Sequence, residues 1–324
     1  MRLPLALSLA ALVIAPSLRA DEFQIAVIPK GTTHEYWKSI NAGAVKAQRE
    51  LKTKGTDVTI IWKGPLLEDD REQQIQVVEN FVGRGVSAIV LAPLDNRALV
   101  APVEDAVNAG IPVIVIDSGL LSSKPASTVA TDNRKGGRIG AKRLGELLGG
   151  KGRVMMLRYE VGSASTEERE AGFMEVMKSD FPGIELISTD QYGGATRETA
   201  YKASQNLLNR FGEHTDGIFA PNESTASGML LAIREQGMAG KVKFVGFDAN
   251  EQLVDGLKQG DVQGLVVQDP VKMGYLGVMT AVDVLHHKKV DTSIDTGVGL
   301  VTKETMDDPA ISALIHPPLA EYLK

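Results

Sequence analysis

Short apolar runs rich in β-branched residues recur along the chain, and they constrain its fold more than any other feature. The first four are FQIAVI, VTIIW, SAIVLA and PVIVID. Near-continuous apolar runs of this length are typical of parallel strands that helices cover on both faces. Between the runs, apolar residues follow a helical spacing, as at Ile40, Ala44, Ala47 and Leu51. The pattern therefore predicts an α/β unit with a parallel sheet.

The same alternation resumes after TDNRKGG, residues 131–137. Its strand-like runs are RVMMLR, IELIST, GIFA, KVKFVGF and VQGLVVQ, and helical stretches such as 166–179 and 197–210 separate them. A later helix is expected at 269–287 and a final strand region in IDTGVGLVTKE. Two α/β units of similar length, with no Pro- or Ser-rich tether, predict two domains that several crossings of the chain join.

The first twenty residues differ in composition from the rest of the chain. An arginine precedes an apolar run at 3–15, which ends at the helix-breaking Pro16 and gives way to small or polar residues up to Ala20. This layout is typical of a secretory signal, and the run is too short to span a bilayer permanently. The alternative is a buried N-terminal helix. We expect residues 1–20 to be a signal peptide that is cleaved near Ala20.

Cysteine is absent from the sequence, and the formal net charge is −6. No disulfide can then stabilise the fold, and no cysteine behind the signal can carry a lipid. We therefore expect a periplasmic protein without a lipid anchor. An acidic chain without a basic stripe argues against nucleic acid as a partner, because phosphate contacts need clustered Lys and Arg. No histidine pair has metal-ligand spacing, and we expect neither a metal nor a cofactor.

Polar and aromatic residues follow several predicted strands at their carboxyl ends, where open α/β sheets bind ligands. The candidate binding residues are Lys30, His34, Tyr36, Trp37, Asp117, Ser118, Arg169, Asn222, Asp248 and Gln268. Singly, most have a structural alternative: the aspartates can cap turns, the tryptophan can belong to the core, and the lysine can be a solvated surface residue. Their recurrence at strand ends favours a binding site.

The chemistry of these side chains fits a polyhydroxylated ligand. Asp and Asn can bridge neighbouring hydroxyls, Arg offers a rigid fork of donors, and an indole face suits the apolar side of a sugar ring. IPKGTTHEYW places Tyr36 and Trp37 side by side in a chain with 5% aromatic residues. The alternative is a carbohydrate-active enzyme with Asp117 and Asp248 as paired carboxylates. No GxSxG, HExxH or phosphate-cradling glycine loop accompanies them, so we do not expect an enzyme.

Eight longer sequence stretches within residues 23–304 are together more specific for one protein family than any single short motif. They are AVIPKGTTHEYWKSINAGAVKA, FVGRGVSAIVLAP, IPVIVID, TDNRKGGRIGA, ASTEEREAGF, IFAPNES, VGFDAN and GLVVQDPVKMG. Together they resemble periplasmic ribose-binding-type sugar receptors, of the periplasmic binding protein type 1 superfamily. The resemblance implies two Rossmann-like three-layer α/β/α domains joined by three hinge crossings, near residues 131–132, 268–269 and 296–299. The expected lobes are 21–131 plus 269–297 (N-terminal) and 132–268 plus 298–324 (C-terminal).

The resemblance also implies a function and a role for the candidates. It places an aromatic clamp at Tyr36 and Trp37, and polar ligand contacts at Asp117, Arg169, Asn222, Asp248 and Gln268. The implied function is capture of a monosaccharide by hinge closure and its delivery to an inner-membrane ABC permease, by a monomeric protein. A chemoreceptor or a sensor kinase is an alternative partner, and an autoinducer-2-like compound is an alternative ligand.

Four positions depart from the ribose-binding pattern. Lys30 stands where ribose binders have a serine, His34 where they have an asparagine, and Ser118 where they have an arginine. The aromatic residue of the second domain aligns with Ala195. We hypothesise that Lys30 supplies the donor lost at Ser118, and that Ala195 leaves room for a larger or differently oriented sugar. These departures argue against ribose itself.

Overall fold

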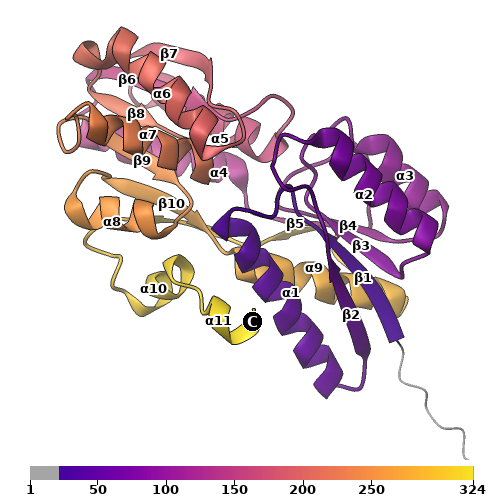
Figure 1. The fold of residues 1–324 in the computed structure, drawn as a ribbon. Helices are drawn as coiled ribbons and strands as arrows, with labels where there is room; N and C mark the ends of the chain where they lie inside the picture. Colours follow the sequence, from indigo (N-terminus) through magenta and orange to yellow (C-terminus); the bar gives the residue numbers. More distant parts are fainter. Residues whose placement is uncertain (1–21, 324) are drawn as a thin grey trace, which may run out of the picture.

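The computed structural model describes residues 22–323, so the expected signal peptide lies outside the described residues. Two six-stranded sheets form the centres of two lobes, and helices cover both faces of each sheet (Figure 1). The prediction of two three-layer α/β/α domains is confirmed. Within 22–323, no helix combines the length and the apolar character needed to cross a membrane.

The N-terminal lobe contains an all-parallel sheet. Its strands are β1 (Glu22–Ile28), β2 (Asp57–Trp62), β3 (Ala88–Leu91), β4 (Val113–Ile116), β5 (Ser127–Ala130) and β11 (Ser293–Asp295), in the order β11-β5-β4-β3-β1-β2. Its helices are α1 (Glu35–Thr53), α2 (Arg71–Arg84), α3 (Val100–Asn108) and α9 (Pro270–Leu285). Alternate residues of β1 enter different clusters: Ile25 and Val27 pack with α1 and α9, whereas Ala26 and Ile28 pack with α2 and α3. This double coverage explains the unbroken apolar run.

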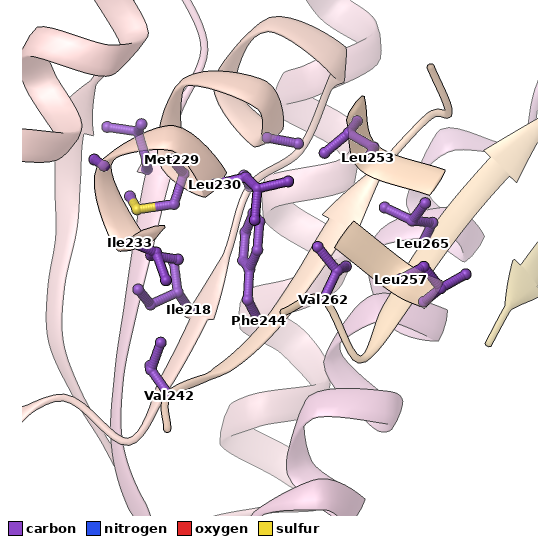
Figure 2. Close-up of a cluster of buried hydrophobic side chains, with 14 of the residues drawn as sticks. Ile218, Met229, Leu230, Ile233, Val242, Phe244, Leu253, Leu257, Val262 and Leu265 are labelled. Carbon is purple, nitrogen blue, oxygen red and sulfur yellow. The ribbon is translucent and has the colours of Figure 1, made fainter. Parts of the chain in front are cut away.

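The C-terminal lobe repeats this plan with one antiparallel strand. Its strands are β6 (Gly152–Arg158), β7 (Ile184–Tyr192), β8 (Gly217–Phe219), β9 (Lys243–Phe247), β10 (Gly264–Gln268) and β12 (Val298–Val301), in the order β12-β10-β9-β8-β6-β7, and β12 runs against β10. Its helices are α4 (Asn133–Leu147), α5 (Ala164–Ser179), α6 (Arg197–Phe211), η1 (Gly212–His214), α7 (Glu223–Glu235), α8 (Glu251–Gln259) and α10 (Pro309–Ile315). Figure 2 shows part of its core, where side chains of α7 and α8 pack against β8, β9 and β10.

The chain passes between the two sheets three times: from β5 to α4, from β10 to α9, and from β11 to β12. Asp132 and Asp269 cap the helices that follow the first two passages, where their carboxylates accept hydrogen bonds from the N–H groups of Lys135 and Lys272. The expected lobe boundaries and the hinge role of these passages stay predictions.

The end of the described chain contacts the N-terminal lobe, whereas the expected division, which stays a prediction, places 298–324 in the C-terminal lobe. The last helix, α11 (Leu319–Tyr322), lies against α1 of the N-terminal lobe (Figure 1). Arg49 donates hydrogen bonds to the carbonyl oxygens of Glu321 and Tyr322, at 2.8 and 3.3 Å, and its guanidinium lies over the Tyr322 ring. These contacts attach the tail to α1, and no local sequence pattern indicates them.

Candidate functional site

A cavity between the two lobes brings together nine of the ten predicted binding residues. Its lining from the N-terminal lobe, the N wall, is Lys30, His34, Tyr36, Trp37, Glu68 and Asp117. Its lining from the C-terminal lobe, the C wall, is Tyr159, Ser165, Thr166, Arg169, Asn222, Glu223, Asp248 and Gln268. The cavity volume inside this lining is about 30 Å³, so the two walls lie close to each other in this structure. Strand-end residues of both sheets therefore meet at one place, although their contact with a ligand stays a prediction.

Asp117 and Asp248 hold equivalent positions at the ends of β4 and β9. Both have left-handed backbones, with φ of 64° and 66°. Asp tolerates this conformation better than most residues. Each backbone N–H donates to the neighbouring strand, to the Val129 carbonyl at 3.1 Å and to the Val266 carbonyl at 2.7 Å. The two strand ends thus anchor two carboxylates in the lining of one cavity.

Lys30 and Tyr36 hold the Asp117 carboxylate. The lysine Nζ lies 3.4 Å from Asp117 Oδ2, and the Tyr36 hydroxyl donates to Asp117 Oδ1 at 2.7 Å. Burial, and then the charge of Asp117, raise the pKa of Tyr36 well above its usual value, so the phenol stays a donor. Only 3% of Lys30 is exposed, which excludes the alternative of a solvated surface lysine.

Tyr36 and Trp37 lie in the first turn of α1 and pack edge to face, with ring centroids 5.1 Å apart at 86°. Trp37 both lines the cavity and belongs to the core beneath α1. The two interpretations of this residue, core and site, are therefore compatible. Its Nε1 donates to Glu68 Oε1 at 2.7 Å, which fixes the plane of the indole.

Glu68 and His34 form a buried ion pair, with 2.7 Å between His34 Nδ1 and Glu68 Oε1. Burial opposes charge on both groups. The hydrogen bond and charge of Glu68 nevertheless raise the pKa of His34 above 6.5, and His34 lowers the pKa of Glu68. The Tyr159 hydroxyl, from the other lobe, donates to Glu68 Oε2 at 2.7 Å.

Arg169 organises the C wall from α5, with 2% of its surface exposed. Its Nε donates to Asn133 Oδ1 at 2.8 Å and its Nη1 to the Pro221 carbonyl at 2.9 Å. Nη1 also lies 3.8 Å from Asp248 Oδ2, and the guanidinium covers the Phe247 ring. Burial raises the pKa of Asp248 to about 6, although the nearby Arg169 charge acts in the opposite direction.

A glycine on α4 makes this position of α5 possible. A β-carbon added at Gly137 would lie 1.9 Å from the Arg169 carbonyl oxygen, well inside contact distance. The two helices therefore touch backbone to backbone beside the Arg169 side chain. A larger residue at 137 would displace the start of α5 and with it the guanidinium.

Three further C-wall residues, Asn222, Glu223 and Gln268, belong to the start of α7 and the end of β10. Asn222 caps α7 through Thr225 N, and Asn250 Nδ2 donates to Glu223 Oε1 at 3.0 Å. Gln268 Nε2 donates to Asp248 Oδ1 at 2.6 Å. The buried Oε1 of Gln268 has no hydrogen-bond partner among residues 22–323. Buried acceptors are normally satisfied, so this oxygen can accept a bond from a ligand.

Ser118 is the predicted residue that does not line the cavity. It is fully buried, and its Oγ accepts a hydrogen bond from Ser165 N of the other lobe at 3.1 Å. Lys30 Nζ also crosses between the lobes, to Ser163 Oγ and Ser165 Oγ, each at 3.2 Å. With Asn96 N donating to the Gly162 carbonyl at 2.8 Å, these bonds show the lobes in contact around the cavity.

Five lining residues were not predicted: Glu68, Tyr159, Ser165, Thr166 and Glu223. Four of them lie where the sequence pattern predicts ligand contacts. Tyr159 directly follows β6, Ser165 and Thr166 lie in the first turn of α5, and Glu223 lies in the first turn of α7. Glu68 lies in the loop between β2 and α2, where no pattern distinguishes it. Ala195 is buried and is not among the lining residues of this cavity, so the expected room for a larger sugar stays a prediction.

The periplasmic binding protein domain family has a model that matches residues 25–289 of the chain. The chain belongs to this family. The D-ribose/D-allose-binding protein of Pseudomonas aeruginosa is 32% identical over 292 residues, which cover 86% of this chain and 88% of that protein.

Two solved structures of solute-binding proteins are also similar. The carbohydrate transporter protein of Agrobacterium radiobacter, in complex with D-arabinose, is 37% identical with a TM-score of 0.85, covering 91% of this chain and 99% of that one. The ABC transporter protein of Agrobacterium vitis, with bound D-fucose, is 35% identical with a TM-score of 0.85, covering 90% and 100%. The expected two-lobed binding-protein fold is thus confirmed at the level of the family.

Proposed function

We propose that this protein is a periplasmic receptor that captures one uncharged monosaccharide between its lobes. One observation carries the proposal: every carboxylate of the lining already has a cationic partner. The pairs are Asp117 with Lys30, Asp248 with Arg169, Glu68 with His34, and Glu223 with Arg197. A sugar phosphate, a sugar acid or an amino sugar would lose hydration here without gaining a free counter-charge. Neutral hydroxyls can instead bond to these paired groups.

The similar proteins support a sugar of this class. Ribose, allose, arabinose and fucose, which their names and titles give, are all uncharged monosaccharides. The Trp37 indole offers an apolar surface to the C–H side of a ring, and the carboxylates and Arg169 offer charge-assisted bonds to its rim. Lys30 and His34 stand where ribose binders have a serine and an asparagine. These two differences favour a sugar whose hydroxyls are arranged differently from those of ribose.

Binding is proposed to proceed by closure of the lobes. A ligand that contacts both walls stabilises the closed arrangement in proportion to its extra contacts there. Several charge-assisted hydrogen bonds in a dry cleft suffice for micromolar affinity, about −8 kcal/mol. The closed protein would then deliver its sugar, unreacted, to an ABC permease in the inner membrane. Growth on the sugar should be lost in a deletion strain and restored by the gene.

Isothermal titration calorimetry tests the proposal directly. The panel comprises D-ribose, D-allose, D-arabinose and D-fucose, with ribose 5-phosphate, D-glucuronate and D-glucosamine as charged counterparts. We expect at least one neutral sugar to bind at micromolar Kd or tighter, and to be recovered unchanged after overnight incubation. Tighter binding of a charged compound, no binding of any neutral sugar, or its turnover would contradict the proposal.

A further inference from the structure

Glu68 occupies an unusual place in the cavity, because one carboxylate joins the two walls. Its Oε1 accepts from Trp37 Nε1 and faces His34 Nδ1, both in the N-terminal lobe. Its Oε2 accepts from the Tyr159 hydroxyl in the C-terminal lobe. All three distances are 2.7 Å, and the side chain is 6% exposed.

These three donors leave Glu68 little capacity to bind a ligand itself. A carboxylate accepts about four hydrogen bonds, and three are already used within the protein. Its effect on a ligand must therefore pass through the side chains that it holds. Gly31 makes room for it, since a β-carbon at that position would lie 2.8 Å from Glu68 Cγ.

Tyr159 is a well-fixed partner on the opposite side. It directly follows β6, its side chain is 2% exposed, and its backbone N–H donates to Glu170 Oε1 at 3.2 Å. Burial, and then the charge and hydrogen bond of Glu68, raise the pKa of the Tyr159 phenol well above its usual value. The hydroxyl therefore remains a donor, and its bond to Glu68 forms only where the two lobes meet.

We propose that Glu68 is a positioning residue that couples the orientation of Trp37 to closure of the C-terminal lobe through Tyr159. This inference rests on the proposed function, in which a sugar is held between the walls. One carboxylate end sets the indole that a sugar ring would face, and the other end completes an inter-lobe hydrogen bond beside it. A sugar that packs on Trp37 is thereby linked to the closed arrangement.

A double-mutant cycle in calorimetry tests the coupling, with the neutral sugar of the panel that binds the parent protein most tightly. Glu68→Gln should weaken binding about tenfold, because an amide accepts at only one end and would turn its NH₂ toward a donor. Tyr159→Phe should weaken binding about threefold to fivefold, mainly through faster release. The two effects should be less than additive in the double variant, because both changes act on the same Glu68–Tyr159 bond.

Matched control variants distinguish a loss of the Glu68–Tyr159 coupling from a general loss of stability. Asp69→Asn neutralises the neighbouring acid, whose side chain is exposed, and Tyr192→Phe removes a hydroxyl of the C-terminal lobe outside this cavity. Both should bind like the parent, and Tyr159→Phe should leave the Tm of the ligand-free protein within about 1 °C. Single effects that simply add in the double variant, or parent-like affinity of Glu68→Gln, would overturn the inference while leaving sugar binding intact.

A second readout needs no ligand. The chain has two tryptophans, so Trp62→Phe leaves Trp37 as the single indole reporter. In that background, Glu68→Gln should shift the Trp37 emission maximum, whereas Asp69→Asn should not. If the parent binds none of the neutral sugars, the proposed function fails. An unchanged emission maximum in Glu68→Gln overturns the positioning role on its own.

Discussion

The two walls of the cavity share a backbone plan and differ in the side chains placed on it. Asp117 and Asp248 each follow the fourth strand of their sheet, with the same left-handed backbone. The helix after the first strand opens with Tyr36 and Trp37 in the N-terminal lobe, but with two hydroxyl residues, Ser165 and Thr166, in the C-terminal lobe. The repeated fold therefore fixes where the acids lie. The first turn of the helix that follows the first strand differs: it places two rings in the N wall and two hydroxyl groups in the C wall.

The cations of the two walls differ in a second way. Arg169 binds Asn133, Pro221 and Asp248, all within its own lobe. Lys30 binds Asp117 in its own lobe but also reaches the serines of the opposite helix α5. The C wall is thus organised by internal bonds, whereas part of the N wall is completed only when the lobes meet. The predictions below test this difference, from the largest expected effect to the smallest.

Arg169→Met should have the largest effect, because it removes the centre of the C wall. Binding should weaken more than about a hundredfold, since several charge-assisted bonds are lost together. Asp248 would be left buried beside no cation, so the free energy of unfolding should fall by about 3–5 kcal/mol. Calorimetry and urea unfolding measure the two effects. An unchanged unfolding curve would show that the C wall is not internally organised.

Asp248→Asn and Asp117→Asn compare the equivalent acids. Each keeps the side-chain volume but removes a charged acceptor, which contributes about 1.5–3 kcal/mol to a hydrogen bond. Each should therefore weaken sugar binding about tenfold to a hundredfold in calorimetry. If one variant binds like the parent, only one wall contacts the ligand, and the comparison between the walls fails.

Gly162→Ala tests the contact between the lobes. Gly162 has φ of 92°, and a β-carbon there would lie 2.3 Å from Asp95 Oδ2 of the other lobe. The variant should weaken binding about tenfold, because the closed arrangement becomes strained. Gly237→Ala is the matched control, with φ of 65° and no heavy atom within 4 Å of the added carbon. Equal affinities for the two variants would contradict a requirement for closure.

Acidification should have the smallest effect. With the pKa of Asp248 raised to about 6, lowering the pH to 5.5 protonates most of this acid, and affinity should fall about fourfold relative to pH 7.5. Between pH 3.8 and 6 the folded state binds the extra proton, so the contribution of Asp248 to ligand-free stability rises as the pH falls. Asp248→Asn should lose this part of the pH dependence of binding, and an identical profile in the variant would reject the assignment.

Much of this molecule was predictable because its strands are buried on both faces. That burial requires unbroken apolar runs such as FQIAVI, and parallel strands end at one edge, so residues like Asp117 and Asp248 could be located before the structure was known. The same reasoning extends to Tyr159, which directly follows β6.

Other features depend on contacts that no local pattern records. Glu68 is the first of three consecutive acids in an irregular loop, and only the fold brings it to the indole. Ser118 follows a strand as expected, yet its hydroxyl bonds to the opposite lobe because the lobes meet there. The position of α11 on α1 depends likewise on Arg49, 272 residues away from Glu321 along the chain. Such long-range contacts become visible only in three dimensions.

A crystal structure with the neutral sugar that binds most tightly tests the central claim most directly. We predict a single sugar ring between the lobes, with one face toward Trp37 and hydroxyls hydrogen-bonded to Asp117 of the N wall and to Arg169 and Asp248 of the C wall. A sugar bound outside this cavity, or held by one lobe while the other remains apart, would contradict the account.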